Sequence, residues 1–460
     1  RLREAEERAR HSLNVALNTL RGVLGGALET DDLQIGLRPG AVATDLAEFE
    51  THHAAGRWRE AAALVGGDFL QGLSLDDSSG FEDWLAAERL HWRGRGMDAL
   101  IRHAGGLLDT ACLTDAQDVA RFALSLDPLS EAAVRLVVRA LTIAGERSRA
   151  LQCAQEFMER LRDAFQAEPS SETRALFERV RGERITGPVT TDHQASTRRL
   201  SLVGRESALS GLLSAWTVCC RERRSTLVLV QGDVGAGKTR LLEELAGRAR
   251  LDGATVILVR AVEADMAEEA ASLGALTRGD LRRAPGVAGA SPRAITALGA
   301  RIPEWGSGRA AEPGAEPMTL QAAFEEVVRA ATEEAPVILI IDDAQWSDRI
   351  SLLALEAVLR SLKNAPLLVG LAYSAPPSRE EFDRLRSRIP RDQAGVAVDL
   401  GPLNLAAVRS LAAQVLPGYG TNELDRLARR MATDAAGFPL LVWELLHAVA
   451  SGLELQQPGG

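Results

Sequence analysis

One short segment restricts the fold of this chain more than any other. The apolar run Thr226–Val230 leads into Gly232-Asp-Val-Gly-Ala-Gly-Lys238-Thr239, and a helical pattern follows. A glycine-rich turn between a strand and a helix, closed by lysine and threonine, is typical of a phosphate-binding loop. Glycine lets the backbone wrap an anion with its N–H groups inward, and the next helix adds its positive end. The segment therefore predicts an α/β domain that binds a nucleotide.

The residue types of this loop predict separate roles. Nucleotide contacts are expected from Gly232, Val234, Gly235, Ala236, Gly237, Lys238, Thr239 and Arg240. Lys238 would reach the β and γ phosphates, and Thr239 would offer its hydroxyl to Mg²⁺. Of 53 basic residues, only Lys238 and Lys363 are lysines. Because arginine serves wherever a positive charge suffices, a lysine at position 238 indicates a site that needs a compact ammonium group.

A pair of acids supplies the second half of this site. The apolar run Val337–Ile341 ends in Asp342 and Asp343. A strand of a parallel sheet delivers such carboxylates to the edge where ligands bind. We expect Asp342 to hold Mg²⁺ together with Thr239, and Asp343 to orient the attacking water as the catalytic residue. The predicted cofactors are ATP and Mg²⁺, with a solvated strand end as the structural alternative for the two acids.

Length and composition limit the classes of protein to which the chain can belong. A chain of 460 residues is too long for one core, and its 46% hydrophobic and 25% charged residues are those of an ordinary soluble protein. The net charge of −10 argues against binding of polyanions by the whole surface, although not against one basic DNA-reading face. Neither a membrane-spanning run nor a signal peptide is visible, so we expect a cytoplasmic protein without a membrane partner.

Periodicity predicts several segments. Residues 1–50 hold a helix with Leu13, Leu17, Leu20 and Leu24 on one stripe, followed by a hairpin over 28–37. Residues 51–183 are helical, 184–200 are a polar linker, 201–400 alternate strands with helices, and 401–460 are helical again. The chain opens inside a helical pattern and stops soon after another one, which predicts a fragment of a longer protein.

The alternating region predicts a parallel sheet, because its strand candidates are short and almost wholly apolar. These candidates are Thr226–Val230, Ala254–Val259, Val337–Ile341, Leu367–Ala372 and Val396–Leu400. The stretch Glu263–Pro317 interrupts the rhythm and is expected to be an insertion. In the helical region, Ala120 and Ala154 recur in similar contexts at about the 34-residue tetratricopeptide period. An irregular helical bundle is the alternative.

The nucleotide region resembles a known family of ATPases. The residues that carry the resemblance are Asp342-Asp343-Ala-Gln-Trp-Ser-Asp348, Leu202-Val203-Gly204-Arg205-Glu206 and Gly437-Phe438-Pro439. They are similar to signal-transduction ATPases with numerous domains (STAND), a branch close to the AAA+ fold. The resemblance implies that Val203, Gly204 and Arg205 pack beside the adenine. It also implies that Pro439 belongs to a helical lid that senses the nucleotide.

Two departures from that family affect the expected rate. Many AAA+ proteins carry glutamate after the metal-binding aspartate and arginine after the fourth strand, where this chain has Asp343 and Ser374. A shorter acid would hold water less well, and the γ phosphate would lose one sensor. We therefore expect slow ATP hydrolysis, suited to a switch that changes domain packing.

The helical region resembles the bacterial transcriptional activator domain. The motifs are Ala55-Gly-Arg-Trp58-Arg-Glu-Ala61, Gly67-Asp-Phe-Leu70, Phe81-Glu-Asp-Trp-Leu85, Leu126-Asp-Pro128 with Glu131, and Glu168-Pro169. That tetratricopeptide-like domain is characteristic of the Streptomyces antibiotic regulatory protein (SARP) family, where it follows an OmpR-type winged helix-turn-helix. The resemblance implies that 1–50 is the C-terminal part of such a DNA-binding domain and 51–183 the activator domain. The expected fold class is therefore multidomain: a partial winged helix, an all-α tetratricopeptide-like domain, then an α/β P-loop ATPase with a parallel sheet and a helical lid.

The first helix contains the candidate DNA contacts. By the resemblance it corresponds to a recognition helix, and the residues placed away from its leucine stripe or on its flank are Arg8, His11, Asn14, Asn18, Thr19 and Arg21. A solvated helix face is the alternative, because residues 1–50 hold six arginines against nine acids, a poor footprint for DNA.

The sequence predicts an ATP-binding transcriptional regulator. Its expected partners are promoter DNA, RNA polymerase, proteins bound by the helical repeats and, depending on nucleotide, further copies of itself. One alternative is a P-loop signalling ATPase whose helices bind a protein client, with no role on DNA. A second is a signalling scaffold in which the ATPase serves an effector outside this chain.

Overall fold

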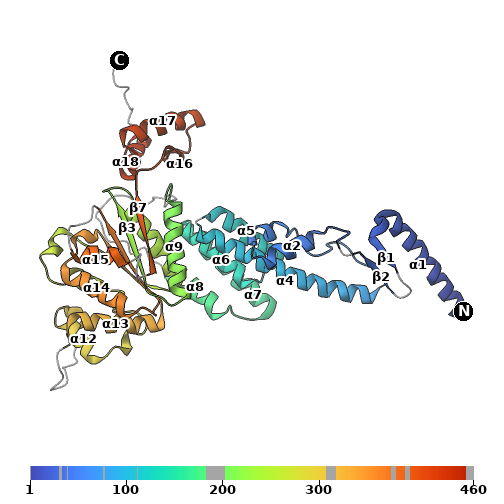
Figure 1. Cartoon of the computed structure of the whole chain (residues 1–460), viewed down its shortest axis with the longest axis horizontal. Coiled ribbons are helices and arrows are strands. Elements are labelled where there is room, and N and C mark those ends of the chain that lie inside the picture. Colours follow the sequence, from blue (N-terminus) through green and yellow to red (C-terminus); the bar gives the residue numbers. More distant parts are fainter. Residues whose placement is uncertain are drawn as a thin grey trace, which may run out of the picture. The chain divides into compact units, whose positions relative to one another are not determined.

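The computed structural model describes two compact units, residues 1–103 and 104–460. Figure 1 colours the chain from blue at the N-terminus to red at the C-terminus. The described residues are 2–30, 34–38, 40–75, 78–110, 112–182, 202–306, 318–374, 380–388 and 394–451. The linker predicted at 184–200 lies outside these ranges. Within them, no helix combines the length and the apolar character that a membrane span requires.

The first unit opens with a long helix and a hairpin. Helix α1 (Leu2–Leu24) and the short helix η1 (Gly25–Ala27) lead into β1 (Leu28–Thr30), which pairs antiparallel with β2 (Ile35–Leu37). Both elements lie where the sequence predicted them. The leucine stripe, however, is not buried among the described residues, because Leu13 is 50% and Leu20 44% exposed. Contacts of α1 with η1 and β1 leave these two leucines largely open to solvent.

An aromatic cluster holds the rest of the first unit together. Helices α2 (Asp45–Ala54), α3 (Trp58–Ala63) and α4 (Ser79–Asp109) contribute to it. Phe49 is buried and packs edge-on against Trp92, while the Arg102 guanidinium lies 4.8 Å from the centre of the Trp58 ring. This arrangement gives packing roles to aromatic residues in the motifs of the helical region.

The second unit begins with the remaining helices of that region, α5 (Leu113–Leu126), α6 (Glu131–Ile143), α7 (Arg147–Phe165) and α8 (Ser171–Gly182). They share one apolar core, in which Val134, Phe157 and Val180 are fully buried. The Ser130 hydroxyl caps α6 by accepting a hydrogen bond from the Ala133 N–H. The helical prediction is therefore confirmed, whereas the tetratricopeptide period stays a prediction.

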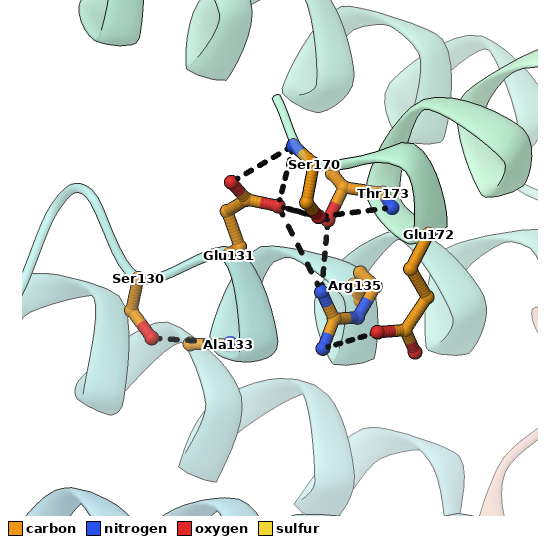
Figure 2. Close-up of polar contacts among 7 residues, drawn as sticks. All are labelled: Ser130, Glu131, Ala133, Arg135, Ser170, Glu172 and Thr173. Atoms are coloured by element: carbon orange, nitrogen blue, oxygen red, sulfur yellow. Dashed lines mark hydrogen bonds and ion pairs between the residues drawn. The ribbon is translucent and has the colours of Figure 1, made fainter. Parts of the chain in front are cut away.

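A carboxylate joins α6 to the start of α8, as Figure 2 shows. Glu131 accepts hydrogen bonds from the backbone N–H of Ser170 at 3.0 Å and from the hydroxyls of Ser170 and Thr173. Arg135 donates to the Thr173 hydroxyl at 2.8 Å and pairs with Glu172 at 3.3 Å. Glu131, singled out in the activator motif, thus holds two helices together.

The α/β region contains a sheet of five parallel strands. They are β3 (Thr226–Gly232), β4 (Thr255–Arg260), β5 (Val337–Asp342), β6 (Leu367–Tyr373) and β7 (Ala394–Leu400), in the order β4-β5-β6-β3-β7. Each overlaps one of the predicted runs. Helices α9 (Glu206–Arg221) and α10 (Lys238–Leu251) bury one face of the sheet. Helices α13 (Leu320–Glu334) and α14 (Arg349–Ser361) bury the other, which confirms the α/β fold (Figure 1).

Short helices occupy the described part of the predicted insertion. These are η2 (Glu263–Met266), α11 (Ala271–Thr277), η3 (Val287–Gly289), α12 (Pro292–Gly299) and η4 (Pro303–Trp305). The buried Asp348 caps α14 and accepts hydrogen bonds from the N–H groups of Ala270 and Ser272 at 3.0 and 3.1 Å. This acid of the ATPase motif therefore anchors the insertion.

The chain continues with α15 (Glu380–Arg388) before β7, and then with the helices α16 (Leu405–Val415), α17 (Thr421–Asp434) and α18 (Pro439–Ala450). The last three share a small core that includes Val408, Met431 and Val442. This core also takes up the half-buried Val203 from the segment before α9. The predicted helical C-terminal region is therefore present.

Replacing Glu131 by Gln tests the α6–α8 clamp. Burial raises the pKa of Glu131, but the hydrogen bonds from Ser170 and Thr173 and the charge of Arg135 outweigh it, so the pKa lies below its ordinary value. The folded state thus favours the carboxylate. The contribution of Glu131 to stability is complete above about pH 4.3, the pKa of a glutamate in the unfolded chain. It is lost as the pH falls through the lower pKa of Glu131 in the folded state. We expect Glu131→Gln to lower the free energy of opening of α8 by about 1 kcal/mol at neutral pH.

Hydrogen exchange of α8, compared between variant and wild type at each pH, measures this difference. The difference should shrink as pH falls below the unfolded pKa. Glu172→Gln is the control: its side chain is 73% exposed, so its loss should change little. An effect of Glu131→Gln that does not vary with pH would contradict the assigned role.

Candidate nucleotide-binding site

The loop between β3 and α10 has a backbone that requires glycine. Gly235 and Gly237 have φ angles of 82° and 94°, in the left-handed region that side chains disfavour. At Gly232, a Cβ atom would lie 3.0 Å from the carbonyl oxygen of Leu400 on the neighbouring strand. The loop therefore adopts a compact turn at the carboxyl edge of the sheet, directly before the N-terminus of α10. This is a place where anions bind.

Lys238 is held inside this turn. Its side chain is buried, and Nζ donates to the carbonyl oxygens of Gly232 at 2.9 Å and Asp233 at 3.0 Å and to the Ser374 hydroxyl at 2.9 Å. Burial lowers the pKa of the Lys238 ammonium, and the charges of Asp343 and Asp342 oppose that shift. Three hydrogen bonds thus hold the Lys238 ammonium group beside the loop, where a phosphate would bind.

The predicted metal ligands are in direct contact. The Thr239 hydroxyl donates to Oδ2 of Asp342 at 2.6 Å, and the Asp342 side chain is buried at the end of β5. A hydroxyl and a carboxylate oxygen at this spacing form a hard oxygen set of the kind that Mg²⁺ prefers. Thr239 and Asp342 therefore fit a magnesium ion, which they would hold and which would neutralise phosphate charge.

Asp343, the predicted catalytic acid, has a partner that the sequence analysis did not consider. Its backbone is left-handed, with φ of 52°. Its carboxylate pairs with the Arg260 guanidinium at the end of β4, with both Nε and Nη2 at 2.8 Å. Gln345 donates to the same carboxylate at 3.3 Å and accepts from the Ser374 N–H at 3.1 Å. A polar chain therefore runs from Arg260 through Asp343, Gln345 and Ser374 to the loop lysine.

Sequence reasoning overlooked Arg260, and it noted Ser374 only as the absence of an arginine. A signal for Arg260 exists, because it directly follows the predicted strand Ala254–Val259. An arginine at the end of a parallel strand reaches the same sheet edge as Asp342 and Asp343. Its pairing with Asp343 depends on β4 lying next to β5, which the sequence did not predict.

The segment before α9 also reaches the loop. Arg205 donates from Nη2 to the carbonyl oxygens of Ala236, at 3.2 Å, and Gly401. Burial lowers the pKa of this guanidinium, and its Nε is buried without a hydrogen-bond partner. Gly204 has a left-handed backbone, and a Cβ there would approach that of Ala407 to 2.6 Å. These contacts place the segment between the loop and the C-terminal helices.

The C-terminal helices contact the loop as well. Pro439 begins α18, and the next residue, Leu440, donates its N–H to the Gly235 carbonyl oxygen at 3.2 Å. Around the loop, Val234 is 80% exposed, Ala236 is buried, and Arg240 pairs with Glu244 along α10 at 3.6 Å. The structure thus gathers the predicted segments at one edge of the sheet, while their contacts with a nucleotide stay predictions.

The candidate DNA contacts lie in the first unit. Their side chains are exposed on α1 at His11, Asn14, Asn18, Thr19 and Arg21. The side chain of Arg8 lies outside the described part of the structure. Thr19 donates its hydroxyl to the Val15 carbonyl oxygen at 3.0 Å, as threonine does on many helix surfaces. Exposure is compatible with a DNA-reading face and equally with a solvated one.

The fold and the site define a P-loop nucleotide-binding domain joined to a helical domain. Comparison with protein families identifies the family of each of these two domains. The bacterial transcriptional activator domain matches residues 32–181, and the AAA ATPase domain matches residues 201–369. This chain is therefore a fusion of a bacterial transcriptional activator domain with an AAA ATPase domain, as the sequence predicted. Such a domain implies nucleotide binding.

The solved structures that match this chain are distant in sequence. A mutant of RuvB from Thermotoga maritima is 15% identical, with a TM-score of 0.31, over 55% of this chain and 64% of that one. Domain III of the replication initiation protein DnaA from the same organism has the same identity and TM-score and is covered to 88%. ORC2 from Aeropyrum pernix is 15% identical, with a TM-score of 0.28, over 55% and 69% of the two chains. The match thus spans less than two thirds of the RuvB chain, and no curated protein matches.

The two lysines of this chain allow a matched test of the loop. We expect Lys238→Ala and also Lys238→Arg to weaken nucleotide binding by about tenfold or more, since a planar guanidinium does not fit where Nζ makes its contacts. Lys363→Arg, at an exposed position, should leave binding unchanged. Titration of a fluorescent ATP analogue measures all three. Wild-type affinity in Lys238→Arg would contradict the need for an ammonium group.

Proposed function

We propose that this chain is an ATP-binding transcriptional regulator whose P-loop domain is a nucleotide-dependent switch. The observation that carries the proposal is the contact between Thr239 and Asp342 beside the buried Lys238, in one chain with a transcriptional activator domain. ATP would bind with its β and γ phosphates at the loop and with Mg²⁺ on Thr239 and Asp342. Arg205, which contacts the loop at Ala236, and Pro439, which precedes the loop contact of Leu440, would enclose the nucleoside.

Slow hydrolysis is part of this proposal. Asp343 would have to orient the attacking water, yet its carboxylate is already paired with Arg260 and Gln345. Both oxygens of this carboxylate already accept hydrogen bonds, from the Arg260 guanidinium and the Gln345 amide, which leaves it poorly placed to hold and orient a water molecule. Bound ATP would then persist long enough to act as a signal.

Release of Asp343 should raise the rate. We expect Arg260→Ala to increase the ATPase turnover number about threefold or more over a wild-type value below about 1 per second, with little change in ATP affinity. Arg360→Ala, another exposed arginine in the α/β region, is the control. Phosphate release at saturating ATP and Mg²⁺ gives the rates. A lower turnover in Arg260→Ala would mean that this arginine assists the chemistry and would refute the restraint of Asp343.

The second part of the proposal is promoter binding through the first unit. The support is the order of elements, with α1 and β1 ahead of the activator-domain match, which begins at residue 32 and includes β2, and the exposed polar side chains of α1. In an intact winged helix, α1 would be the recognition helix and the hairpin the wing. The helical domain would contact RNA polymerase or other proteins, and ATP would favour one arrangement or self-association of the cytoplasmic regulator.

The specific alternative is a P-loop signalling ATPase with a helical scaffold and no role on DNA. Its supporting observation is the low basic charge of residues 1–50. Footprinting on the DNA upstream of the protein's own gene, with and without ATP and Mg²⁺, separates the two functions. We expect a footprint that changes with nucleotide.

The same assay tests α1 directly. Asn14→Ala together with Asn18→Ala should weaken specific binding about tenfold or more, because asparagine reads adenine through paired hydrogen bonds in the major groove. Asn364→Ala, an exposed asparagine of the α/β region, should bind as the wild type does. Absence of a footprint under every condition would favour the alternative function.

A further inference from the structure

The phosphate-binding helix α10 has a second contact surface at its far end. Its last residue, Leu251, is 4% exposed and belongs to the apolar core of the helical region, with Val134, Val138 and Val180. The other buried residues of that core come from α4 to α8. A leucine of the ATPase domain therefore completes the core of the activator domain. This contact is apolar burial of the kind that stabilises folded domains.

Asp252, immediately after α10, makes a polar link across the same boundary. One carboxylate oxygen accepts a hydrogen bond from Arg139 on α6, and the other accepts from the Trp216 indole N–H on α9 at 2.8 Å. Trp216 is itself buried in the core of the ATPase domain. Because the two donors come from different domains and meet on one carboxylate, Asp252 fixes α6 relative to α9 and α10.

Arg248 provides a third link, one turn before the end of α10. Its side chain is 6% exposed, and Nη1 donates to the Leu108 carbonyl oxygen near the end of α4 at 2.6 Å. Glu244 on the same helix accepts from its Nε at 3.3 Å. Burial of a guanidinium costs free energy unless the group is paired. Separation of the two domains would remove the Leu108 carbonyl as a partner of Arg248, and this loss opposes separation.

We propose that the C-terminal end of α10 is a docking surface for the activator domain, with Leu251 as its apolar centre and Asp252 as its polar link. Through this surface, nucleotide binding is coupled to the position of the activator domain. The coupling rests on the proposed ATP function, whereas the docking does not. Helix α10 has 14 residues, so the docking surface lies about 20 Å from the phosphate site at its N-terminus. A helix of this length moves as a rigid body, so a displacement at one end is transmitted to the other end.

Thermodynamic reciprocity makes the coupling measurable. If ATP has different affinities for the docked and undocked forms, then loss of docking must change ATP affinity by the same factor. Coupling energies between sites in proteins typically correspond to about 5- to 150-fold changes in affinity. The docking residues lie at the end of α10 opposite Lys238 and Thr239, so their substitution removes no predicted nucleotide contact.

The first experiment measures docking in the full chain without nucleotide. Hydrogen exchange of α6 and α8 should rise about fivefold or more in Asp252→Arg, where two arginines face each other, and to a smaller extent in Trp216→Phe, which removes the N–H donor together with part of the buried ring. Arg139→Glu combined with Asp252→Arg should restore protection in part. Glu243→Arg makes the same change of charge at an exposed position on α10 and should have no effect. Unchanged exchange in Asp252→Arg would overturn the docking.

The second experiment measures coupling with the same variants and a fluorescent ATP analogue. We expect Asp252→Arg to change the Kd about fivefold or more, and the double variant to return it toward the wild-type value. A Kd within about twofold of wild type, despite increased exchange in α6 and α8, would overturn the coupling and leave the docking intact. If the wild-type chain binds no ATP, the proposed function fails with the coupling, and the exchange result still decides the docking.

Discussion

The hydrogen bond between the Thr239 hydroxyl and the Asp342 carboxylate joins two strands that are not neighbours. Thr239 follows β3 and Asp342 ends β5, and β6 lies between these strands. The contact forms because all three run parallel and end at one edge of the sheet. The same order brings Ser374, just after β6, within 2.9 Å of Nζ of Lys238. The order of the strands therefore brings the phosphate loop, Asp342 and Ser374 together. The rest of the site depends on this strand order.

Helix α10 gives this site its connection to the rest of the second unit. Its N-terminus lies at the loop, where partial positive charge favours phosphate, and its C-terminal end carries Leu251 into the core of the helical domain. On the other side of the loop, Leu440 of α18 donates to the Gly235 carbonyl. A ligand at the loop would thus lie next to α10 and α18, and α10 continues to the core of the helical domain. This arrangement and the pairing of Asp343 with Arg260 are the support for the proposed nucleotide-dependent switch with slow turnover.

Motif residues in this chain serve structure as often as chemistry. Glu131 of the activator motif ties α6 to α8, and Asp348 of the ATPase motif anchors the insertion through backbone N–H groups. Both acids accept several hydrogen bonds from another part of the chain, and these bonds hold the two parts together. A family resemblance alone does not separate such residues from those that would contact a ligand. Only their surroundings do so.

The sequence by itself determined the phosphate loop and the five parallel strands, because these follow from local patterns of glycine spacing and apolar runs, and its motifs identified the two domain types through their family resemblance. The tertiary structure alone decided that Arg260 faces Asp343, that Leu251 enters the helical core and that the leucine stripe of α1 stays largely exposed. These features depend on which strands and helices become neighbours. The pattern along one segment carries no information about its partner, so pairing and burial emerge only when the elements pack.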